Sequence, residues 1–261
     1  MLMRFGLLRS RLLTASLALG ATWLLALSSS ATSLTGASLF WDAGTLGNGT
    51  LNLLGNAATS CTSDPVGGSC SLSSFTPLNG FYTVNSWTSS WDSEPFVTNN
   101  LNVTNNSANP LTFDVIVTAP VALTGPQTAM SGSIGITLTN TTGTAVLTDA
   151  GASVYRALID GSVVRTLFDP TYTQTCTPPF CTITQNADFG VLPNPPETGP
   201  QANTDIAIRL RFSLSPGDSA SITSVFNIDA VPEPATGALL GLGLVALAAA
   251  RRLARPRAQR R

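Results

Sequence analysis

The chain has 261 residues, enough for one sizeable domain, and all thirteen of its basic residues are arginine. Between residues 38 and 230, four arginines stand against thirteen carboxylates, which gives this body a formal charge of −9. A body this acidic repels phosphate backbones, so we exclude nucleic-acid binding. The chain has no lysine and no histidine, and so lacks the commonest general base. We therefore expect a protein that is not an enzyme.

Residues 1–37 have the pattern of a secretory signal peptide. Arg4, Arg9 and Arg11 precede an apolar run from Leu12 to Leu27. Small residues follow, and either Ser29-Ser30-Ala31 or Thr35-Gly36-Ala37 fits a cleavage site. The alternative is an uncleaved N-terminal anchor helix, but the apolar run is short for a full membrane span.

The body, residues 38–230, shows the two-residue alternation of β-strands and no convincing amphipathic helix. Eight to eleven short strands are predicted, separated by Asn, Gly and Pro turns. They are Ser38–Phe40, Leu51–Leu54, Phe81–Trp87, Phe96–Thr104, Leu111–Thr118, Ser133–Thr139, Thr144–Leu147, Val154–Ile159, Val163–Phe168, Asp205–Leu214 and Ser219–Ile228. This pattern predicts one all-β domain, an antiparallel β-sandwich or jelly roll, flanked by an N-terminal signal helix and a C-terminal transmembrane helix.

Two turn sequences predict β-hairpins. Asp160-Gly161 separates two predicted strands by two residues, which is a strong hairpin signal. Ser215-Pro216-Gly217-Asp218 joins the last two strands and has proline and glycine where a type II turn favours them. We expect the second hairpin to lead directly into the C-terminal segment.

All four cysteines lie in the body. Cys61 and Cys70 flank one turn-rich loop, and Cys176 and Cys181 flank another. In an exported protein these spacings favour two local disulfides, although three pairings are possible. The competing interpretation is a Cys₄ zinc site, but neither spacing is C-x₂-C.

Acidic residues provide the remaining candidates for chemistry. Asp92 and Glu94 lie near Trp87 and Trp91, and an aromatic surface beside two acids is compatible with a glycosidase. The simpler interpretation is that these tryptophans belong to the core and the acids are solvated. We expect no cofactor, with calcium as the open exception. Its candidate ligands are Asp42, Asp149, Asp160 and Asp169, although no D-x-D-x-D-G run is present.

The C-terminus contains a second three-part signal. Pro232-Glu233-Pro234 precedes an apolar run from Ala235 to Ala250, and a cluster of arginines follows it. As a helix, this run would rise roughly 24 Å, somewhat short of a hydrocarbon core of about 30 Å. Long arginine side chains that reach the interface can close that gap and would keep this terminus cytoplasmic, so the body would face outward. The flanking arginines are Arg251, Arg252, Arg255 and Arg257.

Residues 231–261 resemble the PEP-CTERM sorting domain, which combines the Pro-Glu-Pro motif, a short apolar helix and terminal arginines. The resemblance implies recognition by an exosortase, a membrane protease that processes the tail near Pro232, Glu233 and Pro234. The body would then reach the cell surface or extracellular matrix of a Gram-negative bacterium that makes exopolysaccharide. The alternative is a plain tail anchor with a proline-rich stalk.

These observations predict an exported surface or matrix protein with a non-catalytic, structural or adhesive role. The first alternative is a module that binds the cell's exopolysaccharide, and a carboxylate-based glycosidase is the second. In the first alternative, five aromatic residues would provide stacking faces for sugars. They are Trp41, Trp87, Trp91, Tyr155 and Tyr172.

Overall fold

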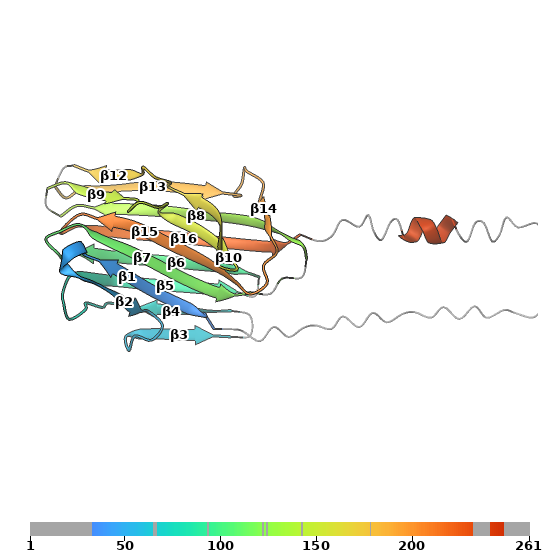
Figure 1. The fold of residues 1–261 in the computed structure, drawn as a ribbon, viewed down its shortest axis with the longest axis horizontal. Helices are drawn as coiled ribbons and strands as arrows, with labels where there is room; N and C mark the ends of the chain where they lie inside the picture. The colour runs from blue at the N-terminus through green and yellow to red at the C-terminus, as the bar shows by residue number, and fades with distance from the viewer. Residues whose placement is uncertain are drawn as a thin grey trace, which may run out of the picture.

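The computed structural model describes residues 33–64, 67–92, 94–121, 123, 125–141, 143–177, 179–231 and 241–247. Within these residues, sixteen strands form two antiparallel sheets (Figure 1). The strands are β1 (Gly36–Asp42), β2 (Asn48–Asn52), β3 (Thr59–Ser63), β4 (Gly67–Leu72), β5 (Tyr82–Asp92), β6 (Phe96–Asn105), β7 (Leu111–Pro120), β8 (Gln127–Thr139), β9 (Ala145–Thr148), β10 (Tyr155–Ile159), β11 (Ser162–Leu167), β12 (Thr173–Cys176), β13 (Thr182–Phe189), β14 (Glu197–Pro200), β15 (Asp205–Leu214) and β16 (Ser219–Ala230). A short 3-10 helix, η1 (Gly44–Leu46), follows β1.

The two sheets pack face to face as a sandwich. Sheet A has the order β11-β10-β15-β7-β1-β2, with β9 joined to β15 and β12 joined to β9. Sheet B has the order β13-β8-β16-β6-β5-β4-β3, with β14 paired to β8. Rings meet between the sheets, as where Tyr82 of β5 lies 5.8 Å from Phe113 of β7, measured between ring centroids. The predicted all-β sandwich is therefore confirmed.

The alternation of residue types decides which side chains face the core. In β15, the five apolar residues at every second position are fully buried. In β16 the inward positions are equally buried, and polar Ser224 is among them. Ser224 is satisfied there because its hydroxyl donates a 2.9 Å hydrogen bond to the carbonyl of Asn99.

The predicted hairpin between β15 and β16 is wrong, although its turn is present. β15 pairs with β7 and β10 in sheet A, whereas β16 pairs with β6 and β8 in sheet B. Gly217 has the expected positive φ of 75°, but the turn carries the chain from one sheet to the other. Turn residues set a local reversal of direction, whereas pairing depends on strands distant in sequence, and both strands are central in their sheets.

The predicted hairpin at Asp160-Gly161 is confirmed. β10 and β11 are antiparallel neighbours, with Ile159 opposite Ser162. Both turn residues have positive φ, 49° at Asp160 and 75° at Gly161, as a type I′ turn requires.

Both disulfides form between the local partners predicted from the spacing. Cys61 and Cys70 face each other across β3 and β4, with their Cα atoms 4.1 Å apart. Cys176 at the end of β12 is bonded to Cys181, just before β13. All four thiols are thus used in disulfides, which excludes the Cys₄ zinc site.

The two ends of the described fold lie at the same end of the sandwich, where β7 passes to β8. The amide of Thr35 donates to the carbonyl of Thr118, and the amide of Val231 donates to the carbonyl of Gln127. We call this the proximal end and the opposite one the distal end. β1 begins at Gly36, and the fold already buries Leu34, so the folded body starts before residue 38.

Candidate functional site

Most of the aromatic residues proposed as sugar-stacking faces belong to the core. Trp87 and Tyr155 are fully buried, and Trp41 and Trp91 are 8% and 5% exposed. Tyr172 is half-buried, and its ring centroid lies 4.4 Å from that of Phe168. The prediction that these rings form an exposed stacking surface is therefore wrong. Strand alternation is the cause, because it points large apolar side chains toward the opposite sheet.

The buried polar atoms of these aromatic residues have partners within the fold. The indole N–H of Trp87 donates to Oδ1 of Asn99 at 3.0 Å, and the hydroxyl of Tyr155 donates to the carbonyl of Val225 at 2.9 Å. Burial raises the pKa of Tyr155 far above its ordinary value. Both groups therefore stabilise the core rather than face a ligand.

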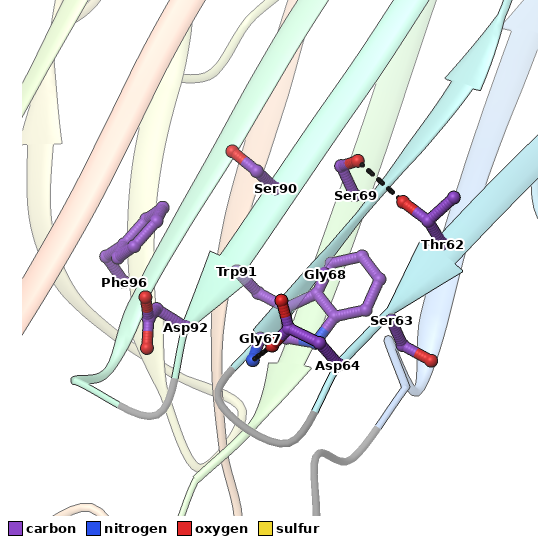
Figure 2. Close-up of a pocket in the computed structure, with 10 residues that line it drawn as sticks. All are labelled: Thr62, Ser63, Asp64, Gly67, Gly68, Ser69, Ser90, Trp91, Asp92 and Phe96. Carbon is purple, nitrogen blue, oxygen red and sulfur yellow. Dashed lines mark hydrogen bonds between the residues drawn. The ribbon is translucent and has the colours of Figure 1, made fainter.

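A pocket of about 380 Å³ lies at the proximal end, between the β3–β4 turn and the β5–β6 turn. Figure 2 shows Asp64, Asp92 and the indole of Trp91 among its lining residues. Trp91 lies against Gly68, where a side chain would collide with the indole. Glu94, the other acid considered for a glycosidase site, is not part of this lining.

Both acids of this pocket also organise the turns beside it. Oδ1 of Asp64 accepts the amide of Gly67 at 3.0 Å, and Oδ1 of Asp92 accepts the amide of Glu94 at 3.3 Å. The sequence prediction missed Asp64 because β3 and β4 are short and rich in serine, threonine and glycine. The only local signal was the nearby Pro-Val-Gly-Gly segment, which indicates a turn.

Each of the four calcium candidates accepts hydrogen bonds from a different part of the fold. Oδ1 of Asp42 accepts the amide of Gly44 at 2.8 Å, and Oδ1 of Asp149 accepts the amide of Gly151 at 2.7 Å. Asp169 accepts the hydroxyl of Ser153 at 2.7 Å. Across the part of the chain that the structure describes, no three Asp, Glu, Cys or His side chains are grouped as metal ligands.

Asp160, the fourth candidate, joins the β10–β11 turn to the start of β15. Its carboxylate accepts the backbone amides of Asn203, Thr204 and Asp205 at 2.8 to 3.2 Å. Partial burial raises the pKa of Asp160, but these hydrogen bonds outweigh it and hold the pKa well below its ordinary value. This carboxylate therefore links the β10–β11 turn to residues 203–205 before and at the start of β15.

The outer face of sheet B is covered by hydroxyl and amide side chains that form ladders between strands. The hydroxyls of Thr104 and Ser219 lie 2.7 Å apart, and those of Thr137 and Thr184 lie 2.9 Å apart. None of the four arginines of the body lies on a strand of sheet B. The sequence prediction overlooked this face because polar residues at alternate positions indicate only exposure to solvent.

A shallow groove of about 370 Å³ runs over this face where β13, β8 and β16 meet. Gly135 lies within it, and an added Cβ there would come 2.7 Å from Oδ1 of Asn186. The groove is lined by small polar side chains, among them Ser133, Thr137, Thr184, Asn186, Asp188, Ser221 and Thr223. It can therefore donate and accept several hydrogen bonds, and Ile134 and Ala187 add apolar surface to the lining.

The C-terminal signal begins where the β fold ends. β16 finishes at Ala230, opposite Thr128 of β8. The structure then describes a helix at residues 241–247, within the predicted apolar segment, with Leu242 and Val245 about two-thirds exposed. No helix in the described ranges is long and apolar enough to cross a membrane.

Several predicted residues lie outside the described ranges. They are residues 1–32 of the signal peptide, the motif Pro232, Glu233 and Pro234, and the arginines Arg251, Arg252, Arg255 and Arg257.

A family profile for the PEP-CTERM protein-sorting motif matches residues 230–252. The match starts at the last residue of β16 and includes the described helix. The chain carries a PEP-CTERM sorting domain. No curated protein matches the chain.

The PEP-CTERM motif identifies an exported protein that is sorted by an exosortase. Such a protein is secreted, held at the membrane and then exposed at the surface. β16 ends at Ala230, the first residue of the match, and the amide of Val231 still donates to the carbonyl of Gln127. A cut after Val231 would therefore leave the pairing of β16 with β8 intact.

Proposed function

We propose that this PEP-CTERM protein is a non-catalytic structural and adhesive component of the cell surface or extracellular matrix. The observation that carries the proposal is the hydroxyl- and amide-covered outer face of sheet B. A broad face of this kind can make many weak hydrogen bonds to a polymer that is itself rich in hydroxyls. The exopolysaccharide of the host is such a polymer and is the partner we propose.

A non-catalytic role is supported by the residues available to the chain. Histidine and lysine are absent, and Asp42, Asp149 and Asp160, which we considered as calcium ligands, hold turns in place through hydrogen bonds. Hydrolysis by two carboxylates would need them on opposite sides of a substrate. Asp64 and Asp92, which line the proximal pocket, each accept a hydrogen bond from a turn amide.

The arrangement of the chain ends supports display of both faces. Thr35 and Val231 lie at the proximal end, so a C-terminal anchor would hold that end toward the membrane. The long strands of both sheets run from the proximal to the distal end (Figure 1). The outer faces would then stand roughly upright and be open to polymers beside the cell.

The alternative is a dedicated carbohydrate-binding module, and the groove over Gly135 favours it. A sugar chain there would be held by hydrogen bonds from threonine, serine and asparagine rather than by aromatic stacking. Each contact contributes about 1 kcal/mol, so useful affinity would require a long polymer that spans several ladders.

Binding of the host's exopolysaccharide to the protein purified from that host tests the proposal. The test variant replaces Thr137, Thr184 and Thr223 with valine, which keeps the side-chain shape and strand preference but removes three hydroxyls from the groove. The matched control is Thr175→Val, at an exposed position of β12 in sheet A. We expect co-sedimentation of the triple variant to fall at least tenfold while the control binds as wild type does. Unchanged binding by the triple variant would contradict the proposal.

A further inference from the structure

Three of the four arginines of the body lie together on the outer face of sheet A. Arg156 of β10 is directly opposite Arg209 of β15 in the antiparallel register. Arg211 lies two residues further along β15 and therefore on the same face. The fourth, Arg165, is elsewhere, in an ion pair with Glu197 at 3.0 Å.

A single carboxylate balances this arginine cluster. Asp114 of β7 accepts Nε of Arg209 at 2.7 Å and Nη2 of the same residue at 2.6 Å. Nη1 of Arg211 lies 3.5 Å from the same carboxylate. Three guanidinium groups and one carboxylate leave a local charge of about +2 on an otherwise acidic body.

Two nitrogen atoms of Arg156, Nε and Nη2, have no hydrogen-bond partner among the described residues, although the same two atoms of Arg209 bind Asp114. Both atoms of Arg156 are buried. In Arg209, those two atoms make the parallel, two-bond contact that guanidinium groups favour with carboxylates. A carboxylate beside Asp114 could therefore bind Arg156 in the same two-bond way, once the Arg156 side chain turns to expose these two buried atoms.

The surroundings of Arg156 destabilise its charge when no anion is bound. Burial lowers the pKa of Arg156, and the positive charge of Arg209 lowers it further. Asp114 partly opposes this shift, and Arg211 adds to it. Like charges directly opposite each other also weaken an antiparallel pair. A bound anion would stabilise the charged form of Arg156 and reduce its repulsion with Arg209, so both effects favour anion binding.

Two neighbouring features favour a sugar acid as the carrier of that carboxylate. Thr112 and Ser213 are paired on the same face, next in register to Asp114 and Arg211, and place two hydroxyls nearby. On the other side, Phe40 of β1 lies opposite Asp114 and is 37% exposed. A flat ring with hydroxyls and a carboxylate can contact all of these groups at once.

An acidic peptide fits the same face less well. The cluster lies on β10 and β15, and β15 has paired neighbours on both sides. An extended peptide gains most of its affinity by adding to a free sheet edge, and the centre of a face offers no unpaired backbone groups. We propose that Arg156, Arg209 and Arg211 form a binding site for the carboxylate of a uronic acid in an acidic polysaccharide.

Titration of polygalacturonate into the protein purified from its host tests this site. We expect binding that weakens as salt rises, because partly exposed ion pairs are screened. Arg156→Gln should weaken it at least tenfold, and Arg165→Gln should leave it unchanged. The triple valine variant of sheet B should also bind polygalacturonate normally, so failure of this site is distinguishable from failure of the proposed adhesive face.

Further measurements test whether the variants are folded and whether binding needs more than attraction between opposite charges. Arg156→Lys keeps the positive charge but cannot form a bidentate hydrogen bond, so it should also lose most of the binding of polygalacturonate. Both variants should melt within a few degrees of wild type, since the buried Nε and Nη2 of Arg156 form no hydrogen bond with the described residues. Full binding by Arg156→Lys, or equal binding of poly-L-glutamate and polygalacturonate to wild type, would overturn the proposal.

Discussion

The hydroxyl of Tyr155 in sheet A donates a 2.9 Å hydrogen bond to the backbone carbonyl of Val225 in sheet B. The bond crosses the core from β10 to β16, next to Gly132. A side chain at Gly132 would come within 2.8 Å of this hydroxyl and within 2.6 Å of the Phe189 ring. The glycine thus makes room for a direct polar link between the two sheets.

Removal of this link should destabilise the sandwich. We expect Tyr155→Phe to lower the free energy of unfolding by about 1–2 kcal/mol, because the hydrogen bond is lost while the ring remains. Urea denaturation followed by fluorescence measures the change. Tyr172→Phe is the matched control, because that hydroxyl is only half-buried and bonds to Gln174. An equal effect in both variants would argue against a special role for the cross-sheet bond.

Asn105 holds the distal turns together. Its side-chain amide donates to the carbonyls of Leu214 and Asn109, each at 2.9 Å, and Oδ1 accepts the amide of Ser107. Its backbone bonds to the β15–β16 turn through Gly217 and Asp218. Asn105→Ala should therefore lower the free energy of unfolding by about 2–4 kcal/mol, because several buried groups lose partners.

The control for Asn105 is its exposed neighbour, Asn106, whose side chain donates to the hydroxyl of Thr83. Asn106→Ala should change the stability by less than about 1 kcal/mol. The two variants differ by one position in the chain, and chemical denaturation compares them directly. Similar losses for both would mean that the buried network is not what holds the turns.

The pH dependence of stability should show a broad plateau with a loss at each extreme. Burial raises the pKa of Tyr82 from 10.0 to about 12, so its contribution is complete below pH 10 and is lost as the pH rises through 12. The pKa of Asp160 is lowered in the fold, so its contribution is present above about pH 4 and is lost at lower pH. No histidine titrates between these limits.

Melting temperatures measured from pH 2 to 12 test this profile. Asp160→Asn should lower the melting temperature at neutral pH and reduce the acid-side loss, because a neutral amide neither titrates nor accepts the three amides equally well. Asp229→Asn, on the exposed face of β16, should leave the curve unchanged. A steep change near pH 6 in the wild type would contradict the expected plateau.

The fold predicts which signal peptide cleavage site is used. Leu34 and Ala37 are buried, and the amide of Thr35 bonds to Thr118. Cleavage after Ala37 would remove the beginning of β1, whereas cleavage after Ala31 leaves the strand whole. N-terminal sequencing of the exported protein should begin at Thr32. A first residue of Ser38 would contradict this prediction.

Periodicity in the sequence correctly predicted the long, half-buried strands such as β15 and β16. It missed β13, where Gln185 and Ala187 interrupt the apolar alternation between Ile183 and Phe189. It also placed β15 and β16 in one hairpin, because residues 215–218 favour a turn whether the chain stays in one sheet or crosses to the other. Local sequence carries little information on which strands pair over long distances.

For the candidate sites too, features that depend on nearby residues were predicted and features that depend on distant strand pairing were not. The cysteine pairs and the sorting motif depend on residues close in sequence and were predicted correctly. The cluster of Arg156, Arg209 and Arg211 depends on the pairing of β10 with β15, which the sequence did not indicate. The aromatic residues failed as ligand candidates because a tryptophan in a strand looks the same in sequence whether it faces solvent or the other sheet.

The most direct test of the account is the intact mass and cell fraction of the protein from its native host. Processing by an exosortase predicts a chain that has lost the residues after about 231–236 and is recovered from the surface or the medium. The sandwich would survive this cut because β16 ends at Ala230. A chain with its arginine-rich C-terminus intact, recovered only from the inner membrane, would contradict sorting and indicate a plain tail anchor.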